Sequence, residues 1–228
     1  MPVNVFELER PAVPVAGTDD RFPVRRIYCI GRNYEKHVAE MGYDVKRSKP
    51  FYFAKPADAI VMSGATVDYP PRTEDLHHEI ELVVAIGKAG SAVTVEQALD
   101  HVFGYAVGID LTRRDLQKAA KEKGRPWEIA KGFDQSAPIS AIHRASEVGH
   151  PAEGRIWLAV NGQIRQDAGL NELIWDVAES IAELSTLFEL APGDLLFTGT
   201  PAGVGPLVPG DEVTGGIEGI DEIQITIR

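Results

Sequence analysis

Two glutamates stand on one face of a predicted strand. Side chains alternate between the two faces of a strand, so Glu79 and Glu81 point to the same side, and that face turns apolar at Val83. Two carboxylates at the edge of a core repel each other strongly unless they are protonated or bound to a cation. Carboxylate oxygens are hard ligands that suit Mg²⁺, Mn²⁺ or Ca²⁺. The pattern therefore predicts a cation site; the alternative is a strand whose outer end faces water.

A third acid, Asp110, ends the apolar strand predicted for residues 102–109. A carboxylate at the end of a strand can point into a site, and its alternative role is to cap the turn that follows. Three acids on two adjacent strands fit an octahedral Mg²⁺ site whose remaining ligands are water or substrate oxygens. Glu79, Glu81 and Asp110 are therefore the candidate metal ligands.

A histidine and a glutamate occur together in residues 31–42, which follow a strand and are typical of a short helix. His37 and Glu40 are three positions apart and therefore neighbours on one helical face. A carboxylate can fix the tautomer of an imidazole, which then serves as a general base for water. The alternative is an exposed surface pair. The motif is not His-Glu-x-x-His, so a zinc protease is not indicated.

The elements that must position these groups are mostly strands. Three more helices are expected: a short one capped by Thr94, one that begins with a capping box at Thr112 and Asp115, and a long amphipathic one at residues 171–189. Because strands and helices do not alternate strictly, we expect an α+β fold with a mixed or antiparallel sheet and few helices. The expected strands are 24–30, 51–54, 78–86, 102–109, 156–160, 195–198, 212–214 and 223–227.

The 228 residues suit one domain whose core needs no disulfide or structural metal. Residues 1–21 mix Pro, Gly and Asp and predict an N-terminal arm or an edge hairpin, which leaves 22–228 as the catalytic domain. A net charge of −11 opposes a general nucleic-acid binder. We expect neither a membrane span nor a signal peptide, because no long apolar run and no basic leader is present. The single cysteine, Cys29, favours a reducing compartment and hence a cytoplasmic protein.

Several short motifs occur in order along the chain. They are Ile-Gly-Arg-Asn-Tyr at 30–34, His-x-x-Glu at 37–40, His-Glu-Ile-Glu-Leu at 78–82, residues 104–112, Lys-Gly-Phe-Asp at 131–134 and residues 193–205. Together they resemble the fumarylacetoacetate hydrolase family, over residues 22–228. Within that family, residues 22–29 and 123–128 favour the small fumarylpyruvate hydrolases of aromatic-acid breakdown over other acylpyruvate hydrolases.

The resemblance implies a mixed β-sandwich roll of the type found in the C-terminal domain of that family, usually a homodimer, with Mg²⁺ or Mn²⁺ as cofactor. It also implies a small-molecule dioxo-acid substrate, with no nucleic acid or membrane as partner. The implied site residues are Glu79, Glu81 and Asp110 for the metal, His37 and Glu40 for activating water, Lys131 beside the substrate, and Gln117 and Thr200 in the pocket wall.

The implied reaction is hydrolysis of the carbon–carbon bond of a 2,4-dioxo acid, with fumarylpyruvate giving fumarate and pyruvate. The metal acts as Lewis acid on the 2-oxo acid, and Lys131, expected at the end of an extended stretch, helps to stabilise the pyruvate enolate. The distal carboxylate of a fumaryl group needs a cation. Arg32 is the first choice for it, ahead of Arg25, Arg113 and Arg114.

Four other functions are compatible with the same residues. Broader acylpyruvate hydrolysis and oxaloacetate decarboxylation use the same chelate and the same enolate. An isomerase or tautomerase needs the metal site but no hydrolytic water, although a base such as His37 also serves enolisation. A binding module without activity would show no turnover and no metal dependence.

Overall fold

The largest unit of the fold is an eight-stranded mixed sheet. The computed structural model describes residues 5–40 and 49–228. The strand order is β4-β3-β15-β8-β9-β11-β5, and β12 also pairs with β9. The β15–β3 and β11–β5 pairs are parallel, and the other pairs of this sheet are antiparallel. The strands are β3 (Arg26–Gly31), β4 (Phe51–Lys55), β5 (Ile60–Met62), β8 (Ile80–Ile86), β9 (Val102–Ile109), β11 (Ala137–Ile139), β12 (His143–Arg144) and β15 (Asp194–Phe197).

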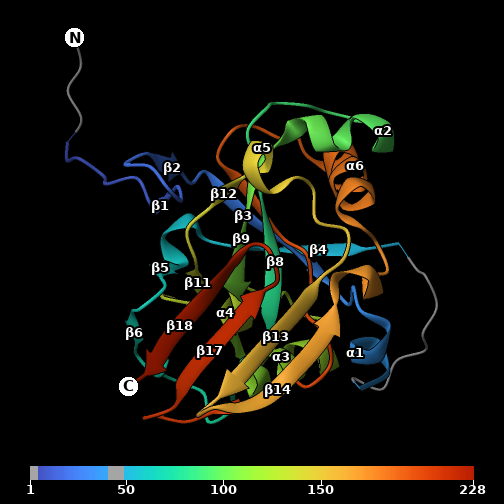
Figure 1. The fold of residues 1–228 in the computed structure, drawn as a ribbon. Coiled ribbons are helices and arrows are strands. Elements are labelled where there is room, and N and C mark those ends of the chain that lie inside the picture. The colour runs from blue at the N-terminus through green and yellow to red at the C-terminus, as the bar shows by residue number, and fades with distance from the viewer. Residues whose placement is uncertain (1–4, 41–48) are drawn as a thin grey trace.

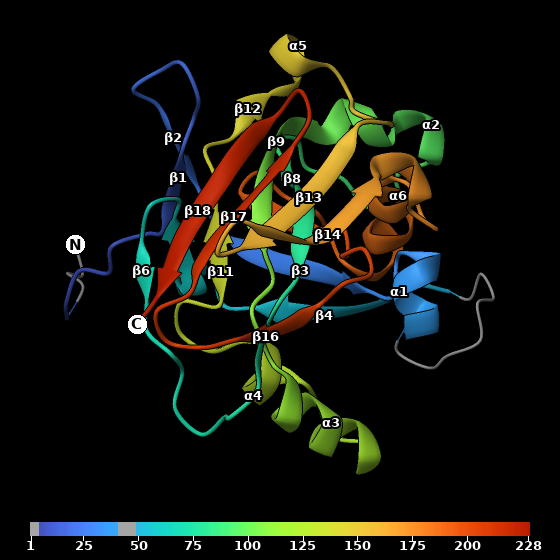
Figure 2. The same ribbon diagram turned by 60° about the horizontal axis from the view of Figure 1, so that its bottom comes forward.

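A five-stranded sheet packs across one face of the larger sheet, as Figures 1 and 2 show. Its order is β14-β13-β17-β18-β6, and only the β18–β6 pair is parallel. Fully buried side chains from both sheets, such as Leu82 and Val107 from one and Leu158 and Ile225 from the other, form the main core. Each such side chain contributes about 1.5–3 kcal/mol by leaving water. The strands are β6 (Thr66–Val67), β13 (Arg155–Val160), β14 (Gln163–Gly169), β17 (Glu212–Ile217) and β18 (Asp221–Ile227).

Two smaller strand units complete the β structure. A three-stranded sheet has the order β10-β7-β16, and β1 and β2 form an antiparallel hairpin. Val13 and Phe22 of this hairpin lie in a second core with Cys29, on strand β3. The division of the chain into an arm and a domain at residue 21 remains a prediction. The bounds are β1 (Ala12–Pro14), β2 (Arg21–Pro23), β7 (Leu76–His78), β10 (Thr112–Arg113) and β16 (Gly205–Leu207).

The helices are short and lie around the sheets (Figure 2). They are α1 (Glu35–Glu40), α2 (Val95–Ala98), α3 (Arg114–Glu122), α4 (Glu128–Lys131), α5 (Ala145–Val148) and α6 (Val177–Leu187), with 3-10 turns η1 (Ala57–Ala59), η2 (Leu99–His101) and η3 (Leu170–Glu172). None of those within the described ranges is long and apolar enough to cross a membrane. The prediction of a strand-rich α+β fold with few helices is confirmed.

Two helix boundaries differ from the prediction. Helix α6 begins at Val177 rather than near residue 171, because the Asp176 carboxylate caps it by accepting a hydrogen bond of 2.8 Å from the Glu179 amide. Thr112 does not cap α3 but belongs to β10. Asp115 accepts from the Thr73 hydroxyl at 2.6 Å and from the Leu116 amide at 2.8 Å, and so ties the first turn of α3 to the preceding loop.

Candidate metal centre and active site

The three predicted metal ligands come together at the ends of two neighbouring strands. Glu81 lies on β8 opposite Gly108 of the antiparallel strand β9, and Asp110 follows β9 directly. The Asp110 amide donates to the Glu79 carbonyl at 2.8 Å, which brings the third acid alongside. One oxygen from each carboxylate lies within 4.8 Å of the others, and all three residues are buried. The three acids therefore lie together, with Glu81 on β8, Glu79 just before it and Asp110 just after β9, and their assignment as metal ligands stays a prediction.

The strand predicted for residues 78–86 is interrupted at Glu79, between β7 and β8. The freed Ile80 amide donates to the Gln166 side-chain oxygen at 3.1 Å, and the His78 Nδ1 donates to the same oxygen at 3.1 Å. Burial lowers the pKa of His78 to about 4, so this imidazole is neutral near pH 7. The Gln166 amide nitrogen donates to the Thr200 hydroxyl and the Pro201 carbonyl, each at 2.8 Å. Through these hydrogen bonds, Gln166 links β14 to the break between β7 and β8 and to the loop that contains Thr200 and Pro201.

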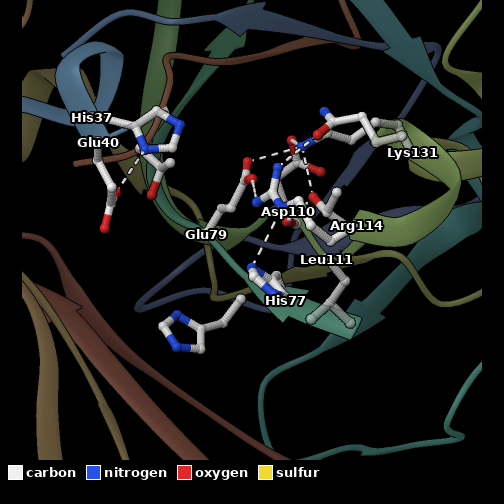
Figure 3. A network of polar contacts seen from close by, with 12 residues as sticks. His37, Glu40, His77, Glu79, Asp110, Leu111, Arg114 and Lys131 are labelled. Atoms are coloured by element: carbon white, nitrogen blue, oxygen red, sulfur yellow. Dashed lines mark hydrogen bonds and ion pairs between the residues drawn. The ribbon is translucent and has the colours of Figure 1, made fainter. Parts of the chain in front are cut away.

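Three cations surround the carboxylates. Lys131 Nζ lies 2.8 Å from Glu79 Oε2, 2.6 Å from Asp110 Oδ2 and 2.7 Å from Thr112 Oγ1. Arg114 forms an ion pair with Glu79. Lys55 Nζ lies 2.8 Å from Asp110 Oδ1, although not in hydrogen-bonding geometry. Figure 3 shows Glu79 between the His37–Glu40 side of the site and the group of Asp110, Arg114 and Lys131.

The acids differ in how their charges are compensated. Burial alone would raise the pKa of Glu79, but the positive charges of Lys131 and Arg114 outweigh it and hold this pKa far below its usual range. Burial raises the pKa of Glu81 well above its usual range, and the charges of Asp110 and Glu79 raise it further.

Glu81 accepts a hydrogen bond of 2.7 Å from the Gly199 amide, and no ion pair to it is found within residues 5–40 and 49–228. A hard divalent cation between three close oxygen donors would relieve the repulsion that raises the pKa of Glu81. The donor set therefore fits Mg²⁺ or Mn²⁺.

The His37–Glu40 pair forms on the short helix α1. His37 Nδ1 lies 3.3 Å from Glu40 Oε2, and the Gly203 amide donates to the Glu40 carboxylate at 3.1 and 3.2 Å. Gly203 has a φ of 94°, and a Cβ at this position would lie 2.0 Å from the Arg165 carbonyl oxygen, so this contact requires glycine. Burial lowers the pKa of His37, which favours the neutral imidazole that a general base requires.

Residue Asn33 anchors the segment that leads into α1. Its side-chain nitrogen donates to the Trp175 carbonyl at 2.9 Å and to the Thr198 carbonyl at 2.8 Å, and its oxygen accepts from the Trp175 amide at 2.8 Å. All the hydrogen-bonding groups of this buried amide are thereby used. These bonds fix the start of α1 against β15 and the approach to α6.

Most of the predicted site residues line one narrow cavity of about 30 Å³. Glu40 and Asp110 do not line it but lie behind His37 and Lys131, which they contact. Lys131 lies on the helix α4, so the prediction of an extended stretch there is wrong. The predicted residues in the wall are Arg32, His37, Glu79, Glu81, Gln117, Lys131 and Thr200.

The four arginines considered for the distal carboxylate of the substrate lie in different surroundings. Arg25 pairs with Asp194 at 3.2 Å, away from this cavity. Arg113 stacks on Phe133, with its guanidinium 4.5 Å from the ring centroid, and does not line the cavity. Arg114 lines it and also donates to the Gln117 side-chain oxygen at 2.6 Å, and Arg32 lines it too.

Sequence reasoning missed two groups that support the carboxylates. Lys55 is buried at the end of β4 and donates to the Leu111 carbonyl at 3.1 Å. The signal for it was a lysine directly after the apolar run 51–54. Gln166 gave no signal, because it stands among exposed residues of β14.

A comparison with known protein families finds one that matches most of the chain. Residues 26–228 match the family described as Fumarylacetoacetate (FAA) hydrolase C-terminal. The chain belongs to the fumarylacetoacetate hydrolase family. The family resemblance read from the motifs is confirmed.

Individual relatives in this family carry names for several reactions. A fumarylpyruvate hydrolase of Ralstonia sp is 49% identical over 189 residues, which are 82% of this chain and 98% of the relative. A mitochondrial oxaloacetate tautomerase of Mus musculus is 41% identical over 204 residues, 90% of this chain and 92% of the relative. The crystal structure of fumarylpyruvate hydrolase from Pseudomonas aeruginosa in complex with Mn²⁺ and pyruvate superposes with a TM-score of 0.97, at 51% identity and 99% coverage of both chains.

Proposed function

We propose that this protein is a metal-dependent hydrolase that cleaves the carbon–carbon bond of fumarylpyruvate to give fumarate and pyruvate. The observation that carries the proposal is a buried three-carboxylate site, in a cavity whose wall also holds a neutral histidine paired with a glutamate. The fumarylpyruvate hydrolases that are 49% and 51% identical to the chain support this substrate over other acylpyruvates.

The His37–Glu40 pair supplies the base. Glu40 accepts the Nδ1 proton of His37, so Nε2 is the nitrogen left to remove a proton from water. The hydroxide formed in this way attacks the 4-carbonyl carbon, and the bond between carbons 3 and 4 breaks with its electron pair going to the pyruvate enolate. The proton taken up by His37 balances the protonation of this enolate at carbon 3. The Gly203 amide holds Glu40 in place, which keeps the imidazole oriented through this step.

The carboxylates and their cations supply the electrophilic side. A Mg²⁺ or Mn²⁺ ion held by Glu79, Glu81 and Asp110 acts as Lewis acid for the oxygens of the 2-oxo acid. The negative charges of the three acids are balanced by the positive charges of Lys55, Lys131 and Arg114. A bound dication would therefore give the site a net positive charge. An anionic enolate product is therefore stabilised there.

Thr200 and Gln117 position the substrate. Because the Gln166 amide already donates to Thr200 Oγ1, the hydroxyl proton of Thr200 is left to donate to a substrate oxygen. Gln117 accepts from Arg114 through its oxygen, so its amide nitrogen is the group it can offer to substrate.

The test is a comparison of fumarylpyruvate, acetylpyruvate and oxaloacetate with metal-depleted protein and after Mg²⁺ or Mn²⁺ is restored. We expect cleavage of fumarylpyruvate only with metal, and loss of that activity in Glu81→Ala. Fast loss of oxaloacetate without cleavage of fumarylpyruvate would refute the proposal. It would favour oxaloacetate tautomerisation or decarboxylation, the second candidate, which the tautomerase 41% identical to the chain supports.

We also propose the cellular setting. The protein acts as a cytoplasmic homodimer in the breakdown of aromatic acids through the gentisate pathway, with residues 1–21 as an arm and 22–228 as the catalytic domain. The single buried cysteine supports a reducing compartment. Light scattering of the purified protein tests the dimer, and a monomer at micromolar concentration would contradict it.

A further inference from the structure

The narrow cavity beside the carboxylates adjoins a wider groove with aromatic walls. The groove has a volume of about 420 Å³, and it shares Arg32, Phe51, Phe53 and Trp127 with the inner cavity. Phe51 and Phe53 are two positions apart on the strand β4, so their side chains point to one face. The Trp127 ring meets Phe51 edge-on at 5.2 Å and Phe53 at 5.7 Å between centroids. These rings offer flat surfaces to whatever extends outward from the site.

Two cations stand at the junction of the cavity and the groove. Lys121, on the last turn of α3, has its Nζ 5.0 Å from the centroid of Trp127. The Arg32 guanidinium lies 5.5 Å from the centroid of Phe51. Both residues line the inner cavity, and Lys121 is one helical turn beyond Gln117, which lines it too.

The electrostatic setting of Lys121 favours an anion. Burial lowers the pKa of Lys121 to about 8, and the positive charges of Arg114 and Arg32 lower it further in the same direction. A carboxylate beside Lys121 would offset this repulsion. The charge of Glu79 acts in the opposite direction and raises the pKa of Lys121, but this carboxylate forms its ion pairs with Lys131 and Arg114 at the metal-ligand end of the cavity.

We propose that Lys121 and Arg32 bind the distal carboxylate of an unsaturated acyl group whose planar chain lies against Phe51 and Trp127. This inference rests on the proposed function, because the 2-oxo acid end must lie at the metal ligands for the acyl end to reach this junction. A planar conjugated chain stacks on aromatic rings. A terminal carboxylate is negatively charged and accepts hydrogen bonds from the two positively charged side chains, Lys121 and Arg32. An acyl group that ends in a methyl has nothing for Lys121 to bind, so Lys121 selects acyl groups that end in a carboxylate.

The test compares Lys121→Met with Lys118→Met, which changes an exposed lysine of the same helix. With fumarylpyruvate, we expect Lys121→Met to lower kcat/KM about 10–100-fold, mostly through KM, because the contact is made in both the ground state and the transition state. With acetylpyruvate, which lacks the distal carboxylate, both variants should stay within about 2-fold of the wild type. The inhibition constant of fumarate should rise in Lys121→Met, and that of pyruvate should not.

The outcomes separate the two proposals. A wild-type protein that cleaves neither dioxo acid refutes the proposed function itself. A wild-type protein that cleaves fumarylpyruvate, with Lys121→Met either unchanged or equally impaired towards fumarate and pyruvate, refutes the role of Lys121 alone. Recovery of most of the fumarylpyruvate activity in Lys121→Arg supports it, because a cation is restored at the same place.

Discussion

Replacing Lys55 with methionine tests whether this buried cation holds the carboxylate cluster together. The Lys55 side chain is fully buried, and Nζ lies 2.8 Å from Asp110 Oδ1 and donates to the Leu111 carbonyl at 3.1 Å. Removing one partner of a buried ion pair costs about 3–5 kcal/mol, because the remaining charge stays buried. For a chain of this size, each kcal/mol shifts Tm by about 2–4 °C. Lys55→Met is therefore expected to lower Tm by roughly 6–20 °C.

The assay is differential scanning calorimetry of Lys55→Met beside Lys88→Met, which changes an exposed lysine just after β8. The control should stay within about 0.5 kcal/mol of the wild type. Saturating Mn²⁺ should reduce the difference in Tm between Lys55→Met and the wild type, since the dication would give Asp110 another positive neighbour. Equal Tm values for the two variants in metal-free buffer would refute the assignment of Lys55 as a support of Asp110.

Other predictions concern the acids, the base and their supports. Metal binding should release protons and weaken as the pH falls, because the raised pKa of Glu81 means that a proton must leave this carboxyl before it binds the ion. Calorimetry in two buffers of different ionisation enthalpy measures the number of protons released, and a value of zero would contradict the prediction. In the pH profile of kcat/KM, the midpoint of the acidic limb should lie below about pH 6.5, because the pKa of His37 is lowered. His37→Ala should remove this limb and reduce kcat about 10²–10⁴-fold without loss of bound Mn²⁺. Gln166→Leu should cost about 1–3 kcal/mol in urea unfolding for each donor left without an acceptor, whereas Gln163→Leu on the exposed part of β14 should cost little. Gly203→Ala should lower both kcat and stability, the latter by about 1–3 kcal/mol, and an unchanged kcat would mean that Glu40 is held in another way.

The carboxylate cluster was predictable because its geometry is local. Glu79 and Glu81 are two residues apart, and Asp110 ends the next long strand, which pairs with β8 in a hairpin-like arrangement. The short spacing of Glu79 and Glu81 and the pairing of β8 with β9 bring the three groups together, although Glu79 itself lies in the break between β7 and β8. The family motifs then joined the His37–Glu40 pair to these acids and added Lys131 and Thr200, and His37, Lys131 and Thr200 line the same cavity.

The parts that could not be predicted depend on contacts between distant segments. At the break at Glu79, the Ile80 amide donates to the side chain of Gln166, which is 86 residues beyond Ile80. Lys131 is helical rather than extended, since residues 128–131 form one turn whose neighbours decide its conformation. The start of α6 was set too early, because the segment before Asp176 is held instead by the side chain of Asn33. Such tertiary contacts override local propensity and leave no periodic signal.

The two halves of the site are supported by different parts of the fold. The three carboxylates proposed as metal ligands lie on or beside β8 and β9 in the middle of the largest sheet, whereas His37, the proposed base, lies on a helix of six residues that Asn33 and Gly203 hold in place. Substitutions confined to α1 can therefore change proton transfer while the enolate-stabilising half keeps its shape. The base and the carboxylates therefore depend on separate supports, and substitutions around residue 37 can alter the base without disturbing the sheet that carries the three acids.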